Sequence, residues 1–363
     1  AELHTSATVA QALPVASTEA AGTGRIARVG PADGSAGVGA VAVRAELDGL
    51  PVREQTGAPF QAGGEVMHAC GHDVHMAALV ALALAAHALE QELPAPLLAV
   101  FQPSEEAYPS GAQELARGEL AALSPAAVVA AHVHPELPWG AVALDTGTVN
   151  ASSDNVEILV EGQPSHGAYP HHGRDPILAL AQIVVALHAQ VGRRIDPHGP
   201  AVLSVGVIEG GDAENVIPSR ALARASLRAH RPQDRQALRE LVKEVVAGVA
   251  AAHGCSGSVQ IVAGEPALEN DPRIIARARE LAPSAGLALA PQWRSCGSDD
   301  FAFFGALAPI AMAFVGLDGA EGFQARPLHH PELLPPDAAV GAVARAQAVL
   351  YLAAAASLQE ATS

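Results

Sequence analysis

The sequence predicts an α/β protein: a larger domain with a mainly parallel sheet covered by helices, interrupted by a small α+β domain. Three observations support this prediction. Apolar runs of strand length alternate with longer helical patterns, four of these runs end beside unusual polar residues, and the middle of the chain follows a different order of elements. The predicted boundaries are 1–151 for the first part of the larger domain, 152–264 for the insertion and 265–363 for the second part.

The strands predicted for the larger domain are nearly continuous apolar runs, as in parallel sheets buried on both faces. Because ligands of open α/β sheets collect beyond the carboxyl ends of the strands, we expect the polar residues that follow these runs to converge. The runs are VGAVAV (38–43) before Arg44, Glu46 and Asp48, LLAVF (97–101) before QPSEE, AAVVAA (126–131) before HVHP, and PIAMAFVGL (309–317) before the later PLHHP.

The predicted insertion has the β-α-β-β-α-β order of a ferredoxin-like domain, and it is long enough to fold as an independent unit. A Pro beside an Asp opens the first helix, and Gly254 is a plausible end for the second. The expected elements, in chain order, are a strand at 155–162, a helix at 175–191, strands at 201–210 and 221–230, a helix at 232–254 and a strand at 258–264.

Composition excludes several classes of function. The 363 residues are 50% hydrophobic and 16% charged, so we expect a large buried core. A formal net charge of -17 opposes binding to nucleic acid or to anionic membrane surfaces, so neither partner is expected. Cys70, Cys255 and Cys296 are odd in number and far apart, and the N-terminal stretch has no basic region followed by an apolar one. These features predict a cytoplasmic protein.

The stretch MHACGHDVHMA (67–77) concentrates metal-binding groups just before an apolar helix. Cys70 and His72 lie two residues apart, which places them on one side of an extended segment but on different faces of a helix. We therefore expect them to share a metal ion immediately before the helix begins.

The adjacent acids Glu105 and Glu106 follow an apolar strand. In an extended segment their side chains point in opposite directions, so one carboxylate can bind metal while the other takes a proton from water. Spacing alone does not say which residue has which role.

Two pairs of histidines follow two other strands. His132 and His134 would point to the same side of a continuing strand, and the adjacent His329 and His330 would point apart. One histidine of each pair is sufficient as a ligand. Together with a thiolate and a carboxylate, imidazoles favour zinc, and manganese or cobalt can replace it where the groups bridge two ions.

The chain resembles the M20 metallopeptidases, specifically their amidohydrolase branch with aminoacylase-like, hippurate-hydrolase-like and auxin-conjugate-hydrolase-like enzymes. The resemblance implies five metal ligands, Glu105 as general base and acid, and Asp48 as an acid that supports the site by contacting a ligand. Those ligands are Cys70, His72, Glu106, His132 and His329. The matching motifs are VRAELDGLPVREQTGAPF, MHACGHDVHMAAL, FQPSEEAYPSGAQEL, HVHPELPWG, SHGAYPHHGRDPI, NVIPSRA, GSDDFAFF and PLHHPEL.

Two motif positions depart from the family pattern. Glu46 stands where the family usually has Asp, and Asp299 stands where Glu is commoner. The additional methylene of Glu46 is expected to shift the contacts of its carboxylate by about 1 Å.

The resemblance implies hydrolysis of the amide bond of an N-acyl amino acid, or a similar small conjugate, by water that one or two divalent ions activate. It also implies a homodimer formed through the inserted lid domain, with His166 and Asn215 binding the substrate. Two alternatives remain open: a dipeptidase or carboxypeptidase on the same scaffold, and a non-catalytic binding protein. Retention of Glu105 and of every candidate ligand argues against the second alternative.

Overall fold

The protein divides into two compact units in the computed structural model, which describes residues 2–30 and 39–362. The second unit comprises Thr148–Leu268 and Arg294–Asp299, and the rest of the chain forms the first unit. The predicted insertion at 152–264 falls within Thr148–Leu268. Residue Val38 of the expected strand 38–43 lies outside the described residues.

The first unit is built on an eight-stranded mixed sheet with the order β1-β2-β4-β3-β5-β16-β6-β15. The neighbours β4, β3, β5 and β16 are parallel, whereas β1, β2 and β6 join by antiparallel pairing. This confirms the predicted α/β class. The strands are β1 (Ser17–Ala20), β2 (Gly24–Val29), β3 (Val41–Glu46), β4 (Leu97–Gln102), β5 (Ala127–Pro138), β6 (Ala141–Ala143), β15 (Ala288–Leu289) and β16 (Ile310–Asp318).

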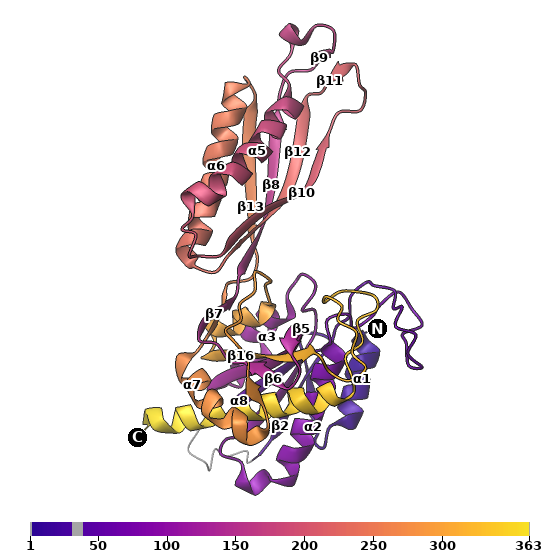
Figure 1. The fold of residues 1–363 in the computed structure, drawn as a ribbon, viewed down its shortest axis with the longest axis vertical. Helices are drawn as coiled ribbons and strands as arrows, with labels where there is room; N and C mark the ends of the chain where they lie inside the picture. The colour runs from indigo at the N-terminus through magenta and orange to yellow at the C-terminus, as the bar shows by residue number, and fades with distance from the viewer. Residues whose placement is uncertain (1, 31–38, 363) are drawn as a thin grey trace. The chain divides into compact units, whose positions relative to one another are not determined.

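Apolar helices cover this sheet, and the long helices α2 and α8 pack against each other and against its central strands (Figure 1). Alanine is abundant in both helices, which allows a close approach to the strands, and their buried residues belong to one continuous core. The helices of the first unit are α1 (Glu2–Ala12), α2 (His72–Ala88), α3 (Gly111–Arg117), α4 (Glu119–Ala122), α7 (Pro272–Leu281) and α8 (Ala338–Thr362).

The second unit contains a four-stranded antiparallel sheet with the order β10-β12-β8-β13. One face is covered by α5 and α6, and β12 alternates accordingly between buried residues and residues that are partly or fully exposed. The order β8-α5-β10-β12-α6-β13 is the predicted ferredoxin-like order. The elements are β8 (Ser152–Glu161), α5 (Pro176–Arg194), β10 (Ala201–Gly210), β12 (Arg220–Ala229), α6 (Pro232–Ala252) and β13 (Ser256–Ala263).

Two short antiparallel ribbons complete the topology. One pairs β9 (Ser165–His166) with β11 (Val216–Ile217) at the end of the four-stranded sheet. The other pairs β7 (Gly147–Asn150) with β14 (Leu268–Asn270), where the chain passes between the two units.

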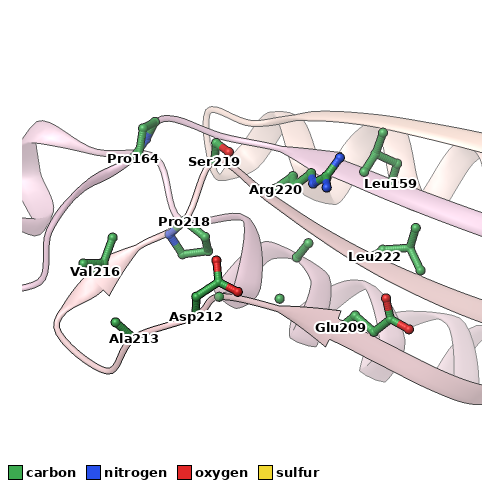
Figure 2. A pocket seen from close by; sticks show the side chains of 13 residues that line it. Leu159, Pro164, Glu209, Asp212, Ala213, Val216, Pro218, Ser219, Arg220 and Leu222 are labelled. Carbon is green, nitrogen blue, oxygen red and sulfur yellow. The ribbon is translucent and has the colours of Figure 1, made fainter.

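A cavity of about 590 Å³ lies in the second unit, beside the loop that leads into β11 (Figure 2). Its lining combines the apolar side chains of Leu159 and Leu222 with the charged groups of Glu209, Asp212 and Arg220. The residues predicted to bind metal lie in the first unit, so this cavity is separate from them in sequence and in domain.

Two helices among the described residues are long and apolar enough to cross a membrane, namely the stretch Pro176–Arg194 and the stretch Ala338–Gln359. The second stretch is 61% buried within the protein, which is typical of a core helix. The first packs one face on the sheet of the second unit.

Candidate metal centre

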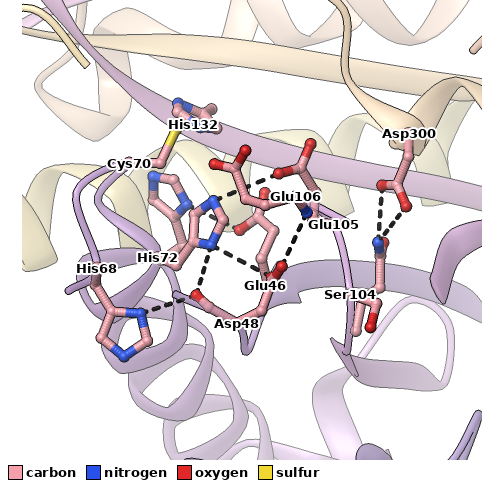
Figure 3. Close-up of polar contacts among 12 residues, drawn as sticks. Glu46, Asp48, His68, Cys70, His72, Ser104, Glu105, Glu106, His132 and Asp300 are labelled. Carbon is pink, nitrogen blue, oxygen red and sulfur yellow. Dashed lines mark hydrogen bonds and ion pairs between the residues drawn. The ribbon is translucent and has the colours of Figure 1, made fainter. Parts of the chain in front are cut away.

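Cys70 and His72 lie at the start of α2, where the chain turns sharply. Gly71 adopts a left-handed conformation with φ of 83°, and a Cβ there would lie 2.5 Å from Cγ2 of Val133. Glycine therefore permits both the turn and the close approach of α2 to β5. The Cys70 and His72 side chains reach the same region at the start of the helix (Figure 3).

Asp48, which follows β3, orients His72 through its main chain. Nδ1 of His72 lies 3.0 Å from the carbonyl oxygen of Asp48 and donates to it. Nε2 of His72 then carries the lone pair, is buried, and has no hydrogen-bond partner. This is the arrangement that a metal-binding imidazole requires.

His132 projects from β5 toward Cys70. Its Nδ1 donates to the carbonyl oxygen of Val133 at 2.6 Å, so Nε2 is the nitrogen that faces the thiol, 3.5 Å from Sγ. His134 lies two residues further along the strand and packs against Trp293, with ring centroids 4.7 Å apart. The structure therefore brings His132, and not His134, to Cys70.

His329 comes from the loop before α8, far away in sequence. Its backbone is left-handed, with φ of 68°, and its N–H donates to the carbonyl oxygen of Ala69 at 2.7 Å. Nε2 of His329 lies 3.2 Å from Oε1 of Glu106. The neighbouring His330 is partly buried and accepts a local hydrogen bond from the N–H of Glu332, at 3.1 Å from its Nδ1.

Glu105 and Glu106 follow β4 and have different surroundings, although they are adjacent. The N–H of Glu106 donates to Oδ2 of Asp48 at 2.8 Å, which fixes the segment beside β3. Oε2 of Glu105 lies 3.8 Å from Nε2 of His72. One acid is therefore paired with His329 and the other lies beside His72.

The histidines make the Cys70 thiol acidic. Burial by itself would raise the pKa of this thiol, but the neighbouring rings of His132, His329 and His72 lower the pKa to about 6. Contacts with Cys70 and Glu106 raise the pKa of His329 to about 10. Since the thiolate is the form of cysteine that binds metal, these surroundings favour a ligand.

The predicted ligands form overlapping groups that fit divalent ions. Within each group the ligand atoms lie within 4.8 Å of one another. Two groups share the Cys70 sulfur, and buried Nε2 of His72 has no hydrogen-bond partner. Sulfur, imidazole and carboxylate donors suit zinc and related ions. The groups are Cys70 with His72 and His132, Cys70 with Glu106 and His329, and His72 with Glu105 and Glu106.

A buried polar network lies behind the centre and includes two residues that are not among the predicted site residues, Gln102 and Asp300. Asp300 accepts hydrogen bonds from Nε2 of Gln102 at 2.7 Å and from Nη2 of Arg44 at 2.9 Å. All three side chains are almost completely buried. The available signal is a polar residue that directly follows an apolar run, as Gln102 follows LLAVF (97–101).

His166 and Asn215, the predicted substrate-binding residues, lie in the second unit. The residue pair His166 and Val216 is in register across the β9–β11 ribbon, and the N–H of Gly167 donates to the carbonyl oxygen of Asn215 at 2.7 Å. A Cβ on Gly167 would lie 3.0 Å from that oxygen. The two predicted residues are thus neighbours in one small ribbon.

Known proteins resemble this chain along most of its length. It is 34% identical to an N-acetyl-L-cysteine deacetylase of Bacillus subtilis (strain 168) over 293 residues, which are 80% of this chain and 69% of that protein. It is 32% identical to an N-acetyldiaminopimelate deacetylase of Geobacillus sp. (strain WCH70), over 83% of this chain and 78% of that protein.

A solved structure agrees with these relatives. The crystal structure of a dinuclear metal-binding peptidase of the M20 family from Bacillus subtilis superposes with a TM-score of 0.84 at 27% identity, covering 99% of this chain and 93% of that one. The model of peptidase family M20/M25/M40 matches residues 42–351. By sequence and by fold, the chain belongs to the M20/M25/M40 peptidase family.

Proposed function

We propose that this protein is a metal-dependent amidohydrolase that cleaves the amide bond of N-acyl amino acids. The observation that carries the proposal is the cluster around Cys70, in which three imidazoles and Glu106 surround one acidic thiol while Glu105 lies alongside. The names of the relatives, deacetylases of N-acetyl-L-cysteine and of N-acetyldiaminopimelate, support this class of substrate.

Cys70, His72, Glu106, His132 and His329 would hold one or two divalent ions. Two candidate groups share the Cys70 sulfur, so this thiolate would be available as a ligand in either group. Zinc suits these donors best, and manganese or cobalt can take its place. When bound, such ions polarise the amide carbonyl and lower the pKa of water toward about 7.

Residues of the protein transfer the proton and hold the ligands in position. Glu105 accepts a proton from the attacking water and delivers it to the nitrogen of the departing amine. Asp48 holds the imidazole of His72 through its carbonyl oxygen and the segment of Glu106 through its carboxylate. No side chain of the protein needs to form a covalent bond with the substrate.

We further propose that His166 and Asn215 bind the carboxylate of the substrate, with the second unit as a lid. An imidazole and an amide can both donate to a carboxylate, whose desolvation must be offset by charge-assisted or dipolar hydrogen bonds. The juxtaposition of the two residues across the β9–β11 ribbon supports a shared role.

The assembly and setting that we propose are a homodimer formed through the second unit, in the cytoplasm, with neither nucleic acid nor a membrane as partner. The four-stranded sheet ends in β10 on one side and in β13 on the other, and an unpaired sheet edge can pair with a second copy. The net charge of -17 supports the absence of nucleic-acid and membrane partners.

The test is an assay of purified protein that has been stripped by a chelator and reloaded separately with zinc, manganese or cobalt. We expect amine release from a panel of N-acetyl and N-benzoyl amino acids, abolished by chelation and restored by metal. Full activity in metal-free protein would contradict the mechanism. Faster turnover of dipeptides would indicate a dipeptidase, and no turnover of any substrate would indicate a binding protein.

A further inference from the structure

Strand β5 continues past the end of its pairing with the neighbouring strand β3. Beyond that point, a histidine side chain accepts a hydrogen bond from the main chain of β5. In the described part of the chain, β3 pairs with β5 from Val41↔Ala127 to Arg44↔Ala130, whereas β5 extends to Pro138. Beyond that point, the N–H of Val133 donates to Nε2 of His75 at 3.0 Å. A buried backbone donor needs a partner, and His75 supplies the acceptor that the neighbouring strand no longer provides.

The main chain of Val133 is also connected to the candidate ligand His132. The carbonyl oxygen of Val133 accepts the hydrogen bond from Nδ1 of His132 at 2.6 Å, while Nε2 of His132 faces Cys70. The N–H of Val133 belongs to the peptide group that begins with the carbonyl of His132. His75 therefore anchors the peptide group of His132, and the next carbonyl orients its ring.

His75 is itself held from the other side. Because its Nε2 accepts from Val133, its Nδ1 carries the proton and donates to Oε2 of Glu46 at 2.9 Å. The other oxygen of Glu46 contacts Nη1 of Arg44, whose Nη2 donates to Oδ1 of Asp300 at 2.9 Å. His75, Glu46, Arg44 and Asp300 are all at most 2% exposed, so the series of contacts is shielded from water.

From this geometry we propose that His75 is a positioning residue, which aims His132 at the metal centre through the main chain of Val133. The proposal rests on the metal-dependent function proposed above. It also gives a role to Glu46, whose two carboxylate oxygens contact Arg44 and His75.

A metal ion held by His75 itself is the competing interpretation, since ligand atoms of Glu46, His75 and His132 lie within 4.8 Å of one another. The hydrogen bonds of His75 and Glu46 argue against a metal ion at this place. Both nitrogens of His75 are engaged, one by Val133 and one by Glu46, and the second oxygen of Glu46 contacts the Arg44 cation. An ion at this place would displace a backbone amide and lie close to a guanidinium group.

The test compares three variants for Co²⁺ binding, measured by competition with a chromophoric chelator, and for the visible absorption spectrum of the Co²⁺-loaded protein. His75→Leu keeps the bulk but removes the acceptor, and we expect the dissociation constant to rise about 10- to 100-fold with a changed spectrum. His75→Gln can accept from Val133 and donate to Glu46, so its dissociation constant should stay within about threefold of the original.

Leu79→Ala is the matched control. Leu79 is fully buried in the same helix and packs in the core, so its truncation destabilises the fold but leaves the hydrogen bond from Val133 to His75 in place. We expect its Co²⁺ dissociation constant and spectrum to remain unchanged, within about threefold. Unchanged binding in His75→Leu would overturn the positioning role, and so would an equal loss in Leu79→Ala.

A double-mutant cycle tests whether Glu46 acts through His75. Glu46→Asp should weaken Co²⁺ binding in the original protein but have no further effect in the His75→Leu background. Fully additive effects would contradict action in series. Loss of one equivalent of Co²⁺ in His75→Leu, with the remaining affinity unchanged, would identify His75 as a ligand. Failure of the original protein to bind Co²⁺ would overturn the proposed function together with the positioning role.

Discussion

Two adjacent acids shortly after β4 differ in what they contact, and this difference supports the proposed roles of Glu105 as proton acceptor and Glu106 as ligand. Oε1 of Glu106 lies 3.2 Å from the ring of His329, whose contact lowers the pKa of Glu106 against the raising effect of burial. Glu105 lies beside His72, whose buried Nε2 has no hydrogen-bond partner. Mutation of each glutamate to glutamine, the corresponding amide, tests the two roles separately.

We expect Glu105→Gln to lower kcat by about 10²-fold or more while the protein keeps its metal, because the amide keeps the shape of the acid but cannot accept a proton from water. Glu106→Gln should lose metal as well as activity. Metal content by mass spectrometry, measured alongside kcat on an N-acyl amino acid, provides the test. The opposite pattern of metal loss would exchange the two assignments.

Cys70→Ser should weaken metal retention, since a hydroxyl with a much higher pKa replaces a thiol that ionises at about 6. Cys255→Ser is the matched control. Its thiol lies in the second unit, where burial raises the pKa, and it belongs to none of the candidate metal groups among the described residues. Dialysis against a chelator followed by metal analysis compares the two, and equal retention would refute the role of Cys70.

At the scale of the elements, strand β8 and helix α6 are joined by ion pairs between one buried aspartate and two arginines. Asp154 is fully buried in β8 and accepts paired hydrogen bonds from Arg235 and Arg239, at 2.6–3.0 Å and 2.7 Å respectively. Although burial raises the pKa of Asp154, the two arginines lower it overall. Removal of this one carboxylate takes away the charge that both guanidinium groups face, although Arg235 still donates to the carbonyl oxygen of Ser153.

Asp154→Ala should lower the free energy of local unfolding around β8 by about 3 kcal/mol. Native-state hydrogen exchange of the β8 amides, performed on the full chain, measures this change. Glu157→Ala is the control on the same strand, because its exposed pair with Arg224 should contribute at most about 1 kcal/mol. An equal effect of both substitutions would contradict a special role for the buried carboxylate.

The same ion pair predicts a dependence of stability on pH. A carboxyl whose pKa is lower in the folded state binds its proton more tightly when unfolded, so its contribution is complete above the unfolded pKa of about 3.9. The contribution is lost as the pH falls through the lowered folded pKa. We expect the exchange protection of β8 to fall with acid in the original protein more steeply than in Asp154→Asn, and parallel profiles would contradict this.

For the molecule as a whole, the proposed division of labour assigns metal chemistry to the first unit and substrate recognition to the second. Replacing the substrate carboxylate by a neutral primary amide should lower kcat/KM by about 10²-fold or more, because a charge-assisted contact is lost and its donors remain unpaired. Asn215→Ala should largely remove the difference between the two substrates. Equal rates for the acid and the amide in the original protein would favour a broader amidase.

The proposed dimer can be tested with two inactive variants. If His166 acts on the site of the partner subunit, mixing Glu105→Gln with His166→Ala subunits should restore part of the activity, since some mixed dimers have one intact site. Mass measurement by analytical ultracentrifugation establishes the dimer, and fluorescence of labelled subunits verifies exchange. No recovery after verified exchange would count against a shared site.

Much of this protein can be predicted from short stretches of its sequence. The α/β class and the family follow from apolar strands that end in dense polar motifs, and both are confirmed. The adjacent acids Glu105 and Glu106 do have different partners, as predicted for an extended segment, although the chain bends there after β4. The ferredoxin-like order of the second unit is equally local, since it depends only on the succession of periodic segments.

Only the tertiary structure decided which of several similar polar residues lie together in the candidate metal centre and in the buried network beside it. Spacing allowed either His132 or His134, and the packing of His134 against Trp293 leaves His132 beside Cys70. Gln102 and Asp300 are far apart in the chain, so no local pattern joins them. Hydrogen bonding among buried polar groups does so, because each group must find its partner wherever the fold places one.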